Sequence, residues 1–219
     1  MIVSKIAGIP QYEFREFIED IQAGDYIRIG KKFREEGSRD LLCQEYQWEV
    51  GLDKIVELEI TTNEDDDEDG ETCEGSGEPK LVLRPLQLAI VIGREEVITV
   101  ILKHIIESNN AEQIMVLLKE QLGHKATINF PCGIDESTYD KDDRSLDGMN
   151  AFHLAAKYYP EGLQVIFDTL ADKDGFYSNI LPLLLEKDGH LQQTPLHVAL
   201  RNPSSDSSEG ARYKDMKDY

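Results

Sequence analysis

The sequence has few cysteines and no long apolar run, and each scarcity excludes a class of protein. Its three cysteines, Cys43, Cys73 and Cys132, are odd in number, with neither a CxxC pair nor disulfide-framework spacing. The longest apolar region, residues 86–106, is interrupted by three consecutive charged residues at 94–96, which makes it a poor transmembrane span. We therefore expect an intracellular, cytoplasmic protein without membrane insertion, and a nuclear location is also compatible.

Motifs that carry catalytic or metal chemistry are also missing. The sequence contains no H-E-x-x-H, no G-x-S-x-G and no glycine-rich phosphate loop. Residues 65–70 match the first half of an EF-hand calcium loop, but Ser76 stands where that loop needs a bidentate glutamate. We expect a non-enzymatic protein with no cofactor and no bound metal, and we interpret the acidic residues 64–78 as a disordered loop.

Basic residues are scarce relative to acidic ones. The chain carries 23 Lys and Arg against 43 Asp and Glu, which gives a formal net charge of -20. This charge opposes binding to nucleic acid phosphates and to anionic membrane surfaces, and it favours basic surfaces. We expect a protein partner of basic or mixed charge and no nucleic acid.

A short segment occurs three times along the chain. Residues 194–200 read TPLHVAL, a threonine and a proline followed by apolar residues at helical spacing. Threonine followed by proline begins a helix, because the threonine oxygen can accept a free backbone N–H and proline has none to lose. Two earlier copies read RPLQLAI at residues 84–90 and NAFHLAA at residues 150–156. After both, a break and a second amphipathic helical segment follow.

This pattern resembles the ankyrin repeat, in which a turn, a short helix opening with TPLHxA, a glycine-containing turn and a longer helix follow one another. The resemblance implies that the threonine and histidine of the motif hydrogen-bond within and between repeats. In this sequence Gln87 replaces the histidine of the first copy, and Asn150 and Ala151 replace threonine and proline in the second. The matching positions are Pro85, Leu86 and Ala89; His153, Leu154 and Ala155; and Thr194, Pro195, Leu196, His197 and Ala199.

The spacing of the copies departs from the family's period. They are separated by 66 and 44 residues, whereas ankyrin repeats recur about every 33 residues. Apolar periodicity predicts an extra helix over residues 111–122. The apolar residues 180–185 predict another, started or kinked by Pro182, and the polar residues 135–147 predict a long loop.

The predicted fold class is all-α, an α-solenoid of about four ankyrin-type helix-turn-helix units with inserted loops and helices. Residues 14–37 look like a degenerate capping unit, and Tyr46, Trp48 and residues 55–60 predict one small pair of strands. We divide the chain into residues 1–45, the N-terminal capping unit; 46–80, an insertion with an acidic loop; 81–200, ankyrin repeats with insertions; and 201–219, a flexible tail or the start of further sequence.

The resemblance implies a protein-interaction module that holds its partner on a concave face made of the turns and the short helices. His153 and His197 occupy the structural histidine position of the motif, so we expect them to act in packing rather than as ligands or catalysts. Two alternatives stay open: the ankyrin portion of a larger enzyme or channel, and an acidic inhibitor of a basic partner. The turn residues expected at the binding face are Asp147, Gly148, Met149, Asp188, Gly189 and His190.

Overall fold

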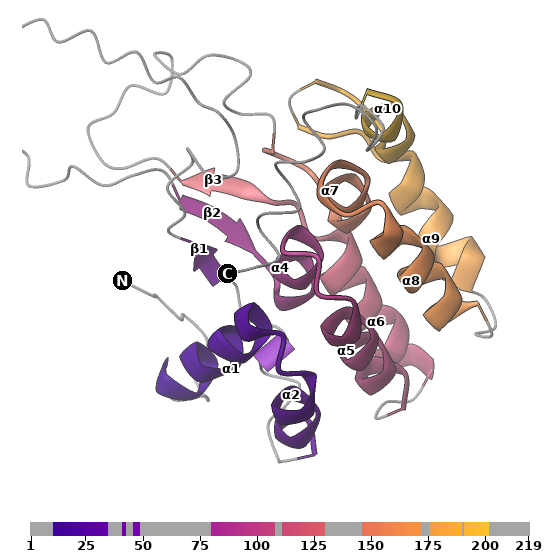
Figure 1. The fold of residues 1–219 in the computed structure, drawn as a ribbon. Coiled ribbons are helices and arrows are strands. Elements are labelled where there is room, and N and C mark those ends of the chain that lie inside the picture. Colours follow the sequence, from indigo (N-terminus) through magenta and orange to yellow (C-terminus); the bar gives the residue numbers. More distant parts are fainter. Residues whose placement is uncertain are drawn as a thin grey trace, which may run out of the picture.

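A computed structural model of the chain describes residues 11–34, 41–42, 46–48, 80–107, 111–129, 146–171, 176–189 and 191–201. The described residues are mostly helical, as the sequence predicts. They form nine helices and one small sheet (Figure 1). The helices are α1 (Gln11–Ala23), α2 (Tyr26–Lys32), α4 (Pro85–Val91), α5 (Glu95–Glu107), α6 (Ala111–Gly123), α7 (Ala151–Tyr158), α8 (Glu161–Leu170), α9 (Phe176–Leu185) and α10 (Pro195–Arg201).

The helices lie in three rows (Figure 1). In the first row, α1, α4, α7 and α10 each contact the next helix, and in the second row α2, α5 and α8 do the same. In the third row, α6 contacts α9. The third-row helices are the two that the sequence predicts as insertions, and they occupy matching places, since each follows a second-row helix in the chain.

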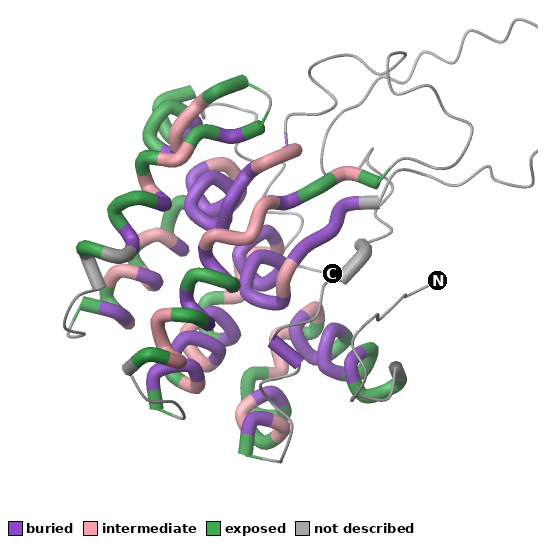
Figure 2. The backbone as a smooth tube through the Cα atoms, turned by 180° about the vertical axis from the view of Figure 1, so that it is seen from behind, coloured by how far each residue is buried: buried purple, intermediate pink, exposed green. Residues whose placement is uncertain are grey.

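Helix α4 lies at the centre of the core. It contacts α1, α5, α6 and α7, and all of its residues from Pro85 to Val91 are buried (Figure 2). The core continues through the apolar faces of α5 and α7, which include Ile98, Ile101 and Phe152. Burying one large apolar side chain contributes about 1.5–3 kcal/mol. Packing between rows therefore stabilises helices that are too short to form alone.

Polar side chains join the turns of successive helix pairs. The Arg94 guanidinium, between α4 and α5, donates from Nη2 to the Gln22 carbonyl oxygen at 2.9 Å. A cation near the C-terminal end of α1 is also favoured by the helix dipole. In the next pair, the Tyr159 hydroxyl donates to Glu95 Oε2 at 3.3 Å, at the start of α5. Each turn is therefore bonded to the helix pair that precedes it.

The sheet is small and antiparallel. Strand β2 (Lys80–Leu83) lies between β1 (Tyr46–Trp48) and β3 (Thr127–Asn129). The strand at Tyr46 is therefore confirmed and pairs with β2. Residues 55–60 lie outside the described residues, so the strand expected there stays a prediction. The sequence did not identify β2, because its three consecutive apolar residues, 81–83, show no alternation and fit a strand or a buried helix equally well.

Most of the predicted helices are confirmed. The N-terminal pair is present as α1 and α2, α6 covers the predicted helix at 111–122, and α10 begins at Pro195. Helix α9 begins at Phe176, so Pro182 lies inside this helix and not at its start. The acidic residues 64–78, most of the predicted loop at 135–147 and the tail at 202–219 lie outside the described residues, and the predictions for them stay predictions.

Candidate partner-binding site

The first turns of α7 and α10 are closed in the same way. The Asn150 backbone N–H donates to His153 Nδ1 at 3.3 Å, and the Thr194 backbone N–H donates to His197 Nδ1 at the same distance. The Thr194 hydroxyl also lies 2.7 Å from His197 Nδ1, so it faces the ring of the motif histidine. In both segments the residue three positions after the cap therefore folds back onto the cap.

Gln87 makes the same pair of bonds in α4 that His153 makes in α7. Its Oε1 accepts the Arg84 backbone N–H at 2.9 Å, and its Nε2 donates to the His124 carbonyl oxygen at 2.7 Å. His153 Nε2 lies 2.9 Å from the Gln193 carbonyl oxygen. An amide and a neutral imidazole each offer one acceptor and one donor. The glutamine that departs from the motif in sequence therefore preserves its hydrogen bonds.

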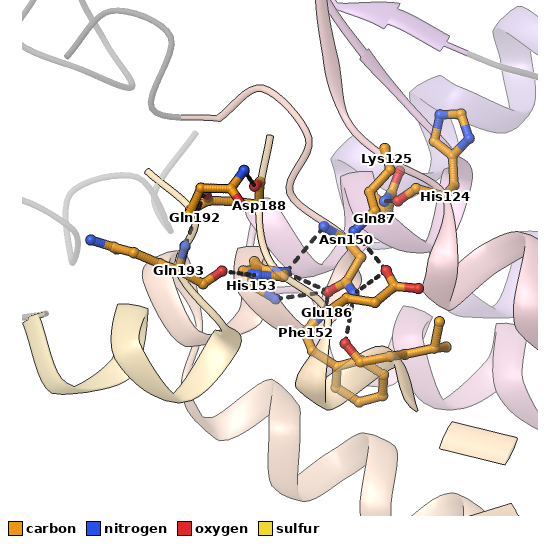
Figure 3. A network of polar contacts seen from close by, with 11 residues as sticks. Gln87, His124, Lys125, Asn150, Phe152, His153, Glu186, Asp188, Gln192 and Gln193 are labelled. Carbon is orange, nitrogen blue, oxygen red and sulfur yellow. Dashed lines mark hydrogen bonds and ion pairs between the residues drawn. The ribbon is translucent and has the colours of Figure 1, made fainter. Parts of the chain in front are cut away.

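The ring of His153 lies at the centre of a buried network (Figure 3). Burial lowers the pKa of His153 below its ordinary value of 6.5, against a smaller raising effect of the Gln193 carbonyl. A neutral ring that donates from Nε2 to Gln193 leaves Nδ1 free to accept the Asn150 backbone N–H. The one unfavourable contact of this tautomer is the 2.7 Å approach of Nδ1 to Asn150 Oδ1.

The Asn150 side chain caps α7 and also reaches the third row. Its Oδ1 accepts the backbone N–H groups of Phe152 at 3.1 Å and His153 at 3.2 Å. Its Nδ2 donates to the Leu183 carbonyl oxygen in α9 at 2.9 Å. One buried side chain therefore both caps the start of α7 and joins α7 to α9. The sequence indicates only the first of these roles, since Asn150 stands in the place of the motif's threonine.

The two predicted turns are in direct contact. The Gly189 backbone N–H donates to the Asp147 carbonyl oxygen at 3.2 Å. Gly148 has φ +76, and a Cβ added there would lie 2.2 Å from the Gly189 nitrogen. Only glycine fits this approach without strain. The structure therefore brings Asp147, Gly148 and Gly189 together at one place, with Gly189 exposed and the other two partly exposed.

Two of the six predicted binding residues have buried side chains. Met149 is in the apolar core, and Asp188 is only 1% exposed. The Asp188 backbone N–H donates to the Gln193 carbonyl oxygen at 2.8 Å, and Asp188 Oδ1 accepts the Gln193 N–H at 3.3 Å. These bonds close the turn before α10, so neither side chain is available to a partner. His190 lies outside the described residues.

Several residues that stabilise the segments around these turns were not predicted from the sequence. Gln193 contributes a backbone carbonyl to two bonds, and Lys125 and Glu186 form an ion pair of 2.6 Å between the segments after α6 and α9. No sequence signal marks a residue that acts through its backbone. Gln87 did have a signal, since it aligns with His153 and shares its acceptor and donor.

An acidic groove lies between α5 and α8, on the second row. It has a volume of about 380 Å³ and is lined by Glu95, Thr99, Glu161, Gln164, Val165, Asp168 and Thr169. At its edge, burial and then the neighbouring Glu95 raise the pKa of Tyr159 to about 12, so its hydroxyl remains a donor to Glu95 at neutral pH. Three carboxylates around an open groove favour a basic side chain.

Neither a metal site nor a membrane-spanning helix occurs in the part of the chain that the structure describes. There, no group of three or more His, Cys, Asp or Glu side chains is placed to hold a metal ion. In the same residues, no helix has the length and apolarity needed to cross a membrane. The segment with the calcium-like sequence at 65–70 lies outside the described ranges.

Comparison with protein-family models, with curated proteins and with solved structures finds no match to this chain.

Proposed function

We propose that this chain is an ankyrin-type repeat protein that acts as a non-enzymatic interaction module for a protein partner of basic or mixed charge. The observation that carries the proposal is the pair of bonds made by Gln87 and by His153, one to their own cap and one to the following segment. The resemblance to ankyrin repeats implies such bonds within and between repeats. The rows of helices follow the order that a stack of repeats requires.

The proposed binding site is the surface formed by the two touching turns. Gly148 and Gly189 let the two turns pack backbone to backbone, because a side chain at either position would meet the other turn. Asp147 places a carboxylate beside them, and only its backbone oxygen is used by the neighbouring turn. The net charge of -20 supports a basic or mixed-charge partner. The acidic groove between α5 and α8 supports the same partner chemistry.

The first experiment is affinity capture with the full chain from a cytosolic extract at low and raised salt, followed by identification of the partner. Three variants with the same change in formal charge then locate the site: Asp147→Lys at the turns, Glu161→Lys in the groove and Glu112→Lys on α6 as the control. Apposition of like charges costs several kcal/mol, so Asp147→Lys should weaken binding by at least about tenfold.

Each outcome of this comparison has a definite meaning. Equal binding by Asp147→Lys and Glu112→Lys contradicts the turn surface as the site, and weakening by Glu161→Lys alone moves the site to the groove. Failure of the full chain to capture any specific partner at either salt contradicts the interaction module. If the captured partner is an enzyme or a transcription factor, its activity with and without the chain tests the narrower function of an acidic inhibitor.

A further inference from the structure

Exposed apolar side chains gather at one end of the rows. Nine large apolar side chains are exposed among the described residues, and five of them are leucines between residues 181 and 200. Helices α9 and α10, which carry four of the five, lie side by side at the end of the molecule opposite α1 and α2 (Figure 1). We call this set the leucine end; it consists of Leu181, Leu185, Leu191, Leu196 and Leu200.

The first row explains why α10 differs from the helices before it. Equivalent positions are Leu86, Phe152 and Leu196, exposed by 0%, 0% and 66%, and Ile90, Ala156 and Leu200, exposed by 0%, 1% and 78%. Helix α7 covers α4, and α10 covers α7. No described helix follows α10 in the row. The residues of α10 that correspond to buried positions of α4 and α7 are therefore left uncovered by the described residues.

We propose that the leucine end is a docking face for residues 211–219 of this same chain. Only nine residues separate this segment from Arg201 at the end of α10, so it stays near the leucines at a high effective concentration. Residues 211–219 read ARYKDMKDY, with Tyr213, Met216 and Tyr219 three residues apart, a spacing typical of the apolar side of an amphipathic segment. They supply the apolar surface that the leucine end needs.

Charge also favours the chain's own tail over a second copy. Residues 211–219 contain three basic and two acidic residues, a net charge of +1, whereas the whole chain carries -20. Two copies brought together at this face would each carry that negative charge and repel one another. A slightly basic segment instead meets an acidic protein. The inference does not depend on the proposed partner, because four of the five leucines lie on α9 and α10 and only Leu191 is close in sequence to the touching turns.

Cysteine labelling tests the docking directly. In the full chain with Cys43, Cys73 and Cys132 replaced by serine, Ala199→Cys places a thiol between Leu196 and Leu200 without removing either leucine. Ala23→Cys, also an exposed alanine in a helix, is the matched control. In a second form of each variant, the tail also carries the substitutions Tyr213→Ser, Met216→Ser and Tyr219→Ser. Circular dichroism checks that all four variants fold.

We expect the thiol at 199 to react at least about tenfold faster when the tail carries the serines, the factor for a docking free energy of about 1.4 kcal/mol. The thiol at 23 should react equally fast in both forms. Equal rates at 199 with either tail overturn the proposal. Slow labelling at 199 with both tails, together with a dimer mass by light scattering, also overturns it and assigns the face to a second copy.

Trypsin cleavage provides an independent measurement without any labelling. In the full chain with its natural tail, Leu200→Gln should speed cleavage after Arg212 and Lys214 by about tenfold, because a docked segment must open before it is cut. Ile27→Gln, on the exposed side of α2, is the matched control. Equal cleavage of the tail in both variants contradicts docking on the leucine end.

Discussion

Replacement of His153 by glutamine should leave the network between the rows intact. Gln87 already makes the same two bonds at the equivalent position of α4, to a cap N–H and to a backbone carbonyl. We therefore expect His153→Gln to lower the free energy of unfolding by less than about 1.5 kcal/mol at neutral pH, the usual limit for shape-conserving exchanges in a core. The variant separates the hydrogen-bonding role of His153 from its charge.

His153→Ala should cost much more. The buried Asn150 N–H would lose its acceptor, which costs about 1–3 kcal/mol, and the bond to the Gln193 carbonyl, worth about 0.5–1.5 kcal/mol, would also disappear. The Gln193 oxygen keeps its bond from the Asp188 N–H, so only one group is left without a partner. With the cavity left by the ring, the total is about 3–5 kcal/mol.

Wild type and His153→Gln should also differ in how their free energies of unfolding depend on pH. Burial lowers the pKa of His153 in the folded state below 6.5, so the unfolded chain binds more protons than the folded chain as the pH falls through this region. The free energy of unfolding therefore falls as the pH falls below 6.5, by at most about 1.4 kcal/mol per pH unit for one group. His153→Gln removes this loss.

Urea unfolding followed by circular dichroism at about pH 7.5 and about pH 5.5, at constant ionic strength, measures both effects. The sequence pI of 4.5 makes lower pH values unsuitable. Burial also lowers the pKa of His104, but that residue is present in every variant and cancels in the difference. The reasoning is refuted if glutamine is as destabilising as alanine, or if the gap between wild type and His153→Gln does not shrink on acidification.

Three other substitutions test separate contacts. Gly148→Ala should destabilise by at least about 2 kcal/mol in thermal unfolding, because φ is +76 and the new Cβ would meet the Gly189 nitrogen; a neutral result contradicts the contact between the turns. Arg94→Ala should cost about 1–2 kcal/mol in urea unfolding through its bond to the Gln22 carbonyl, and Arg94→Lys should restore part of it. Tyr159→Phe should cost about 1 kcal/mol and remove the tyrosine that ionises near pH 12 from a spectrophotometric titration; unchanged high-pH absorbance contradicts this assignment.

Several helices could be predicted from the sequence because their signals are local. Thr194 and Pro195 mark the start of α10, and apolar periodicity marks α6. The correspondence of α6 and α9 could not be predicted, because it depends on contacts between segments that share no motif. Strand β2 was missed for a similar reason, since its partners lie far from it in the chain.

The candidate site was predicted less completely than the helices. Turn residues usually lie at the surface, so Met149 and Asp188 were expected to be available to a partner. Here the turns pack on each other through Gly148 and Gly189, while Met149 packs in the apolar core and Asp188 bonds to Gln193, so both side chains are buried. Whether two turns touch depends on how closely the neighbouring helix pairs pack, and no local sequence pattern determines that distance.

The hydrogen bonds that Gln87 and His153 make to the segments before the next helices place few demands on the sequence of those segments. Gln87 and His153 reach backbone carbonyls of His124 and Gln193, and a carbonyl is present whatever the side chain. The side chain at the position of Gln87 and His153 needs only one acceptor and one donor at suitable distances, and both glutamine and histidine provide them. The side chains of the residues that supply these carbonyls can therefore change without loss of the hydrogen bonds. This latitude explains how segments as different as RPLQLAI and NAFHLAA form equivalent first turns in one chain.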